Sequence, residues 1–565
     1  MKNNKNTMRV LLGGAVLLVG LLTPATPAAS SPGKAALLGA GARNVQHKDM
    51  TARAETAPGR TLRVDRTQAR LTISAWDKNE IAVEATVEVG NSDPEFISEF
   101  LENTTLKLEP AASGPVLRLE SPMDWDRGRW NILKRVGNAL RTGHWNISYA
   151  ARITIRVPAS QSLEIDNHFG DVSMSGITGR LELRNESGAV GVENCGGALE
   201  LRNSFAAVLV RDFRGPVDVR NESGEVRAEN IAGRADIRNS FNDVRFTKIG
   251  GPLTVTSESA SVVGTDVAGD CRITSSFKTI DVRGIRGRLD IKGESSDVVV
   301  GDVDKDAAID SSFKPVKVTN VKGGLRVESE SAAVTAEDIG GDASIKSSFQ
   351  PIAATRVKGR LTVNGESASV TARDIGRDLV INSSFKDVVV EGVGGTLEIR
   401  AESARVTAAD IKKAAAINTS FNAVEARRLG EGLTVEAESG AVLAEDVAGA
   451  VSVKNSFKNV VLRRTSGSIT VSGESSSVDV EDIKILSPGS VIDITTSFKP
   501  IRITLPAGTE IQGSAKTDFG KIITDFAVIL IESGDFDGKA VRFETGKGGI
   551  TLKLATSADI EIKKK

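Results

Sequence analysis

The sequence predicts an all-β fold: an elongated, single-stranded parallel β-solenoid with a β-rich N-terminal cap. Two markers predict it, because each recurs every 36 residues and the two alternate every 18 residues. A period that holds through 18 consecutive units is typical of a repeat array. The phenylalanine markers are Phe169, Phe205, Phe241, Phe277, Phe313, Phe349, Phe385, Phe421 and Phe457. The serine markers, each preceded by a glutamate, are Ser187, Ser223, Ser259, Ser295, Ser331, Ser367, Ser403, Ser439 and Ser475.

Every unit has the same apolar spacing around its marker. In the Phe385 unit, Leu379 and Ile381 precede the marker, and Val388 and Val390 follow it. Apolar residues two positions apart indicate strands with one buried face, and the Gly-rich polar stretches between them indicate turns. We therefore expect each unit to form one coil with two or three short strands. Coils stacked at about 4.8 Å would build a rod of roughly 85 Å.

Two other architectures fit the repeat less well. A left-handed hexapeptide β-helix would need apolar offsets that repeat every six residues, and these do not. A string of small β-sandwiches would need longer units and irregular linkers. The handedness of the solenoid stays open.

The charges explain why the repeat has double length. Equivalent residues of neighbouring coils lie about 4.8 Å apart, so a continuous acidic column would repel itself. Only the Ser coils carry a glutamate before the marker, which spaces these glutamates about 9.6 Å apart. Acidic residues at the seventh position after Ser also alternate with basic residues at the sixth or seventh position after Phe. We expect lysines that follow several phenylalanines to supply counter-charges, and each Phe ring to fill a corner from inside.

The corner glutamates are a candidate ligand or partner surface, for a cation or a periodic polymer such as a glycan. The alternative is a charge-balanced, solvated face. The glutamates proposed for this surface are Glu258, Glu294, Glu330, Glu366, Glu402 and Glu438.

The parts outside the array divide the chain further. A basic start and the apolar run 10–22 are typical of a signal peptide, and the alternative is an uncleaved anchor. Within the cap, Asp93 and Pro94 predict the start of a short helix. We expect a signal peptide at 1–29 and a flexible linker at 30–60. The N-terminal cap is expected at 61–157 and contains an insertion at 124–145. The solenoid follows at 158–505, and irregular C-terminal coils with a cap at 506–565 end in a closing coil.

The insertion 124–145 differs from the rest of the chain. It contains Trp125, Trp130 and Trp145 among several basic residues. A basic amphipathic helix with tryptophan is able to bind a membrane surface or a partner, so we expect peripheral membrane contact as one function. The alternative is a loop or helix that covers the first coil.

The remaining composition argues against several functions. Lys plus Arg total 72 and Asp plus Glu total 73, without the basic excess of a nucleic-acid binder. Cys195 and Cys271 lie four coils apart, about 19 Å along the rod, so they are expected to be unpaired and at buried or edge positions. His47, His144 and His168 are each isolated in the sequence, and no local break in the repeat pattern suggests a catalytic cluster. We therefore expect no enzyme activity, no cofactor and no metal.

The segment 157–197, VPASQSLEIDNHFGDVSMSGITGRLELRNESGAVGVENCGG, carries a V-P-A strand followed by an N-x-x-G-D-V turn. It resembles the bacterial adhesin-like family of β-strand repeats, a domain of unknown function, and the likeness extends over roughly 61–565. The resemblance implies surface attachment and supplies no catalytic residues.

The function expected from the sequence is that of a non-catalytic, exported, rod-like adhesin. Its place would be periplasmic, cell-surface or extracellular, and its partner a protein or glycan of the envelope. The alternatives are a carbohydrate-active β-helix enzyme and a membrane-associated scaffold for envelope stress or signalling.

Overall fold

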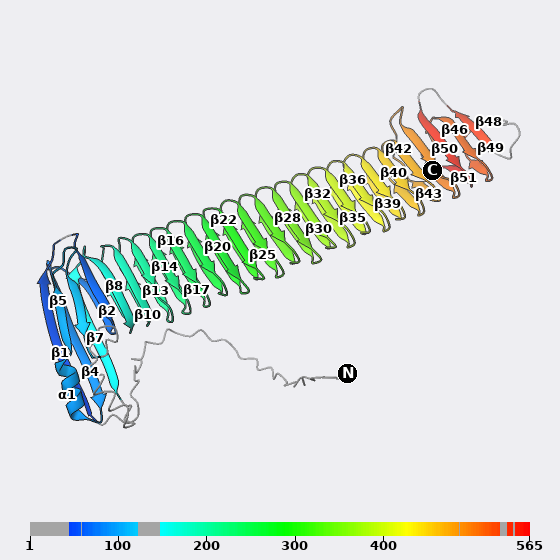
Figure 1. Ribbon diagram of the computed structural model, residues 1–565. Coiled ribbons are helices and arrows are strands. Elements are labelled where there is room, and N and C mark those ends of the chain that lie inside the picture. The colour runs from blue at the N-terminus through cyan, green and yellow to red at the C-terminus, as the bar shows by residue number, and fades with distance from the viewer. Residues whose placement is uncertain (1–43, 58, 123–146, 485, 532–538, 546–548) are drawn as a thin grey trace, which may run out of the picture.

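The computed structural model describes residues 44–57, 59–122, 147–484, 486–531, 539–545 and 549–565. These residues form a long rod of stacked coils with a wider cap at the N-terminal end (Figure 1). Each coil contributes one strand to each of two parallel sheets, called sheet A and sheet B below. The predicted parallel β-solenoid with 18-residue coils is confirmed.

The array strands of the two sheets alternate along the chain. Sheet B contains β8(Ser162–Phe169), β10(Leu181–Ser187), β12(Leu199–Arg202), β14(Val217–Asn221), β16(Ala235–Asn239), β18(Leu253–Ser257), β20(Cys271–Ser276), β22(Leu289–Glu294), β24(Ala307–Ser311), β26(Leu325–Ser329), β28(Ala343–Ser348), β30(Leu361–Glu366), β32(Leu379–Ser383), β34(Leu397–Ala401), β36(Ala415–Thr419), β38(Leu433–Ala437), β40(Val451–Asn455) and β42(Ile469–Gly473). Sheet A contains β9(Val172–Ser175), β11(Val190–Glu193), β13(Val208–Phe213), β15(Val226–Ile231), β17(Val244–Ile249), β19(Val262–Val267), β21(Ile280–Ile285), β23(Val298–Val303), β25(Val316–Val321), β27(Val334–Ile339), β29(Ile352–Val357), β31(Val370–Ile375), β33(Val388–Val393), β35(Val406–Ile411), β37(Val424–Leu429), β39(Val442–Val447), β41(Val460–Arg463) and β43(Val478–Glu481).

The register follows the repeat. Leu379 pairs with Leu361 on one side and Leu397 on the other, so equivalent residues stack in columns 18 positions apart. Inward-facing residues such as Ile381 and Val388 are 0% exposed. The core is therefore a narrow layer of aliphatic columns between the two sheets, which explains why few aromatic residues are needed to fill it.

A left-handed residue bends most sheet A strands just before their last apolar residue. Asp338 and Arg356 have φ values of 60° and 56°, and the glycines at the same place, Gly284 and Gly392, have 70° and 75°. Asp, Asn and Gly tolerate this conformation better than most residues do. The acidic residues at the seventh position after Ser, which the sequence explained by charge alternation, therefore also suit the left-handed backbone at this bend. Non-glycine residues at this bend with positive φ are Asn194, Asp212, Asn230, Lys248, Asp266, Asp302, Asn320, Asp338, Arg356, Asp374, Asp410, Arg428, Asp446, Arg464 and Asp482.

The N-terminal cap extends both sheets and then stops the parallel stacking. In sheet B, β2(Thr61–Thr67) lies parallel between β8 and β6(Val116–Glu120), and β5(Thr105–Glu109) closes this side antiparallel to β6. In sheet A, β3(Arg70–Trp76) lies parallel between β9 and β7(Ser148–Pro158). Next come β4(Glu80–Asn91), antiparallel to β7, and β1(Asn44–Glu55), antiparallel to β4. The antiparallel outer strands end the parallel stacking of coils at this end of the rod.

Two predictions for this region have different outcomes. The short helix is present as α1(Pro94–Glu102), and Asp93 caps it by accepting hydrogen bonds from the backbone N–H groups of Glu95 and Phe96. The expected flexible linker at 30–60 is wrong over residues 44–55, because these form β1 and pair with β4 along their whole length. No helix in the described part of the chain is long and apolar enough to cross a membrane.

The C-terminal end departs from sequence order. After β44(Val491–Thr495) and β45(Ile501–Leu505), the chain forms β46(Ile511–Thr517), β47(Ile522–Thr524), β48(Ile529–Ile531) and β49(Lys539–Glu544). The last strands, β50(Ile550–Thr556) and β51(Ile560–Lys564), then lie between β44 and β46 and between β45 and β47. The final residues form a coil as predicted, but this coil is inserted into the stack rather than closing it.

Candidate functional site

The marker phenylalanines lie on the outside of the rod, at the corner where each Phe coil passes from sheet B to sheet A. All nine from Phe169 to Phe457 are between 55% and 66% exposed, and Phe498, which follows the array, is 72% exposed. The expectation that these rings fill the corners from inside is therefore wrong. The rings instead form a row along one edge of the rod, spaced by two coils, or about 9.6 Å.

Small side chains already occupy the inside of these corners. Ala260 and Ala332, which follow the marker in two Ser coils, are 0% exposed. The hydroxyl of Ser275 donates a hydrogen bond of 2.9 Å to the carbonyl of Ala260, and Ser347 donates one of 2.7 Å to the carbonyl of Ala332. A Phe ring placed inward would displace these residues from a close-packed corner.

The corner backbone is unusual for an aromatic residue at two positions. Phe277 and Phe349 have φ values of 66° and 63°, and the serines of the following coils, Ser295 and Ser367, have 55° and 56°. A bulky side chain in this region is a rare and costly conformation. These rings remain largely exposed, so burial in the core does not offset the cost.

The predicted glutamates lie on the same edge as the phenylalanines. Every glutamate of the column is exposed, and Glu186 pairs with His168 at 3.3 Å. No ion pair joins the other eight glutamates to a described residue, and the same holds for the corner lysines. The expected counter-charge from these lysines is therefore not formed in the part of the chain that the structure describes. We call this surface the Phe–Glu edge; it comprises the phenylalanines Phe169 to Phe457, the lysines Lys278, Lys314, Lys386 and Lys458, and the glutamates Glu186, Glu222, Glu258, Glu294, Glu330, Glu366, Glu402, Glu438 and Glu474.

Charges elsewhere on the rod contrast with this edge. At the bend of sheet A, Arg356 contacts Asp338 at 2.6 Å and Arg428 contacts Asp410 at 2.6 Å, in each case from one coil to the next. The hydrogen bonds from these arginines hold the pKa of both aspartates below the usual range. The predicted alternation of acidic and basic coils is therefore confirmed at these bends.

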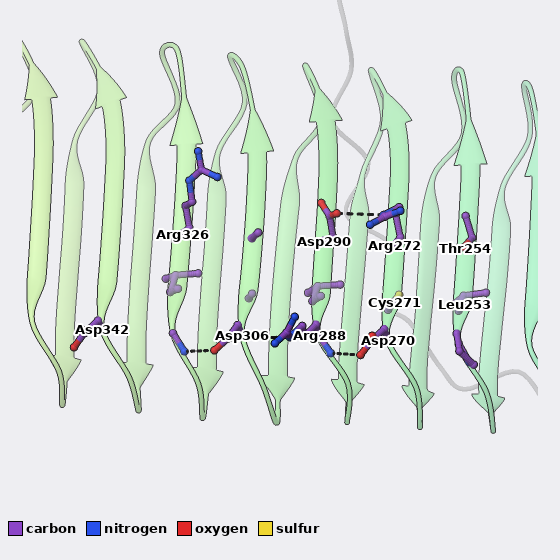
Figure 2. Close-up of a pocket in the computed structure, with 16 residues that line it drawn as sticks. Leu253, Thr254, Asp270, Cys271, Arg272, Arg288, Asp290, Asp306, Arg326 and Asp342 are labelled. Carbon is purple, nitrogen blue, oxygen red and sulfur yellow. Dashed lines mark hydrogen bonds and ion pairs between the residues drawn. The ribbon is translucent and has the colours of Figure 1, made fainter.

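A shallow hollow of about 760 Å³ lies on the outer face of sheet B (Figure 2). It forms where Ala308 stands between longer side chains of the flanking strands. Arg272 and Asp290 pair across it at 3.2 Å, and Asp270 accepts a hydrogen bond of 2.8 Å from the backbone N–H of Arg288. Through these contacts, charged groups of the hollow already hold neighbouring coils together.

Among the described residues, the cysteines and histidines do not come together. Cys195 and Cys271 are buried and unpaired, as predicted, and burial raises the pKa of the Cys271 thiol to about 12. His47 lies beside Asp49 in the cap, far along the chain from His168. Among the described residues, no group of three or more His, Cys, Asp or Glu side chains is arranged to hold a metal ion.

The tryptophan part of the predicted site is outside the described residues. Trp125, Trp130 and Trp145 lie in the range 123–146, as do the other residues of the insertion 124–145. Membrane contact through this segment stays a prediction. The signal peptide predicted at 1–29 is also outside the described residues and stays a prediction.

The exposed position of the phenylalanines was missed because the strand alternation is misleading at the corner. Ile381 and Ser383 occupy alternate positions toward the interior side of β32, and Phe385 continues this alternation. The phase then changes, since the next inward residue is Val388. The informative signal was the small residue after each serine marker, which fills the corner interior.

These observations define a β-solenoid repeat protein with an exposed Phe–Glu edge, on which only Glu186 has an ion-pair partner among the described residues. Comparison of the chain with protein-family models, with curated proteins and with solved structures finds no match. The argument for function therefore rests on the geometry and charges of the rod.

Proposed function

We propose that this protein is a non-catalytic, exported, rod-like adhesin, and that its Phe–Glu edge contacts a protein or glycan component of the cell surface or envelope. The observation that carries the proposal is the repeated exposure of phenylalanine at the same corner of nine double coils. Large exposed apolar side chains that gather on one face, with polar residues around them, commonly mark an interaction site.

The arrangement of the edge supports a partner that is itself extended or repetitive. Each ring contributes a modest contact, and the rod holds all of them in one line at a fixed interval. Contacts on a rigid array add through effective concentration, so weak single contacts are able to produce strong overall binding. The exposed glutamates between the rings would select partners that offer positive charge or hydroxyl groups.

Binding to envelope material from the producing cells tests the proposal. The purified chain should co-sediment with envelope fragments, and a variant with Phe277→Ser, Phe313→Ser, Phe349→Ser and Phe385→Ser should lose most of this binding. Serine is the natural choice, because the Ser coils carry it at the equivalent corner. Arg272→Ala, in the hollow of sheet B, is the matched control and should bind as the parent does.

Two results would reject this function. One is absence of binding by the parent chain to any envelope fraction. The other is equal binding by the parent and the four-serine variant. Loss of binding in Arg272→Ala together with release of reducing sugars from envelope glycans would instead favour the carbohydrate-active alternative and the hollow of sheet B.

A further inference from the structure

We infer that the Phe–Glu edge accepts a second copy of this chain, with two rods lying side by side so that the Phe coils of one face the Ser coils of the other. The inference goes beyond the proposed function, because it concerns what covers the same edge in the free protein, and an envelope partner would have to displace the second copy. It names the occupant of that edge as the chain itself.

Size complementarity is the first support. Along the edge, a large exposed ring alternates with a small serine at every coil. A second edge shifted by one coil places each ring opposite a serine, so that the rings of the two rods interleave. An unshifted pair of edges would place ring against ring and leave space above every serine.

Charge complementarity is the second support. The corner lysines belong to Phe coils and the corner glutamates to Ser coils, and the lysines have no ion-pair partner within the described chain. The shift that interleaves the rings also sets each lysine-bearing coil opposite a glutamate-bearing coil. Long side chains on facing corners are then able to pair across the interface.

An antiparallel pair satisfies both conditions along the whole array. With a twofold axis between Phe313 and Ser331, Phe313 faces Ser331 of the second copy, and Phe169 at one end faces Ser475. Every marker phenylalanine then has a serine opposite, and each corner lysine has a glutamate-bearing coil opposite. Such an interface is self-complementary and closes as a dimer.

The exposed area is sufficient for a stable pair. An aromatic side chain buries about 150–250 Å² in full, so nine rings that are more than half exposed offer roughly 900 Å². A standard interface takes about 800 Å² from each partner. An anionic lipid surface is a poorer occupant, because nine glutamates on the edge outnumber four lysines.

Sedimentation velocity over a dilution series at micromolar concentrations tests the inference. The parent chain should form a dimer. The four-serine variant described above should have a dimer dissociation constant about 100-fold higher or more. Leu530→Ser is the control, because Leu530 is 79% exposed in β48 at the C-terminal end, away from the edge. It should dimerise as the parent does. A monomeric parent, or a four-serine variant that dimerises equally well, would overturn the inference.

Charge reversal provides a second test that does not depend on the rings. Under the twofold arrangement, Lys278→Glu with Lys314→Glu places glutamates opposite Glu366 and Glu330 of the second copy. Glu330→Lys with Glu366→Lys instead places lysines opposite Lys314 and Lys278. Each variant should dimerise more weakly than the parent, while an equimolar mixture should recover dimers. If the mixture dimerises no better than the separate variants, the Phe coils of one rod do not face the Ser coils of the other.

Small-angle X-ray scattering separates the arrangements. A side-by-side dimer keeps the maximum dimension of the monomer and increases its cross-section, whereas end-to-end association lengthens the particle, which would overturn the inference. Failure of this inference is distinguishable from failure of the proposed function. A monomer that binds envelope through its phenylalanines would refute self-pairing alone, and a dimer that binds no envelope material would refute only the envelope role.

Discussion

At the scale of single residues, each Phe corner is determined by what lies inside it. A small residue, which is alanine, serine or glycine, follows each serine marker. Together with the polar residue two positions before each phenylalanine it lines the interior, and the ring is left outside. Strand alternation predicted the aliphatic core correctly, because Ile381 and Val388 lie well inside regular strands. It did not predict the ring, because the alternation changes phase within the turn.

Stability measurements distinguish an outward ring from an inward one. Phe385→Ser should change the free energy of unfolding by no more than about 0.5 kcal/mol, as expected for an exposed site. Ile381→Ala in the same coil should cost about 2–5 kcal/mol, because it leaves a cavity in the core. Urea denaturation of the two variants measures both effects. A loss for Phe385→Ser comparable to that for Ile381→Ala would mean that the ring is buried.

At the scale of coils, the bend of sheet A and the turn that follows it both hold neighbouring coils together. The bend carries a left-handed residue and ion pairs between neighbouring coils. The turn that leads from sheet A back to sheet B carries an aspartate in four Ser coils. One of these, Asp378, accepts a hydrogen bond of 3.0 Å from the backbone N–H of Thr396 in the next coil. The sequence revealed the alternating charges, but the hydrogen bonds to backbone could be identified only from the register of the coils.

Acid should weaken these contacts between coils. The hydrogen bonds from Thr396 and Arg360 lower the pKa of Asp378 to about 2, and Arg356 and Arg428 lower those of Asp338 and Asp410. A pKa that is lower in the folded chain stabilises the fold above the unfolded value, about 3.9, and this contribution disappears as the pH falls toward 2. Circular dichroism should therefore find a melting temperature that falls between about pH 4 and pH 2.

The matched variant for this test is Asp378→Asn. It should melt below the parent at neutral pH and approach it in acid, since the parent loses the same charge there. An equal difference between the two proteins at pH 7 and pH 2 would argue against a contribution from the ionised carboxylate.

At the scale of the whole molecule, regular stacking could be predicted and the ends could not. The 18-residue period determines the register of every array coil, so the rod followed directly from the sequence. The ends depend on contacts between distant segments, such as β2 with β8 and β50 with β44, for which the chain has no repeated pattern. The same limit applied to β1, whose pairing with β4 could not be inferred from composition.

The central claim is that the marker phenylalanines are exposed on the free rod and covered when it binds. Carbene footprinting with mass spectrometry measures this directly, since it compares labelling of each Phe peptide in dilute, concentrated and envelope-bound protein. We expect strong labelling of Phe277, Phe313, Phe349 and Phe385 in the dilute chain, and reduced labelling in at least one of the other two states. Rings that remain unlabelled in the dilute chain, or that label equally in all three states, would contradict the account.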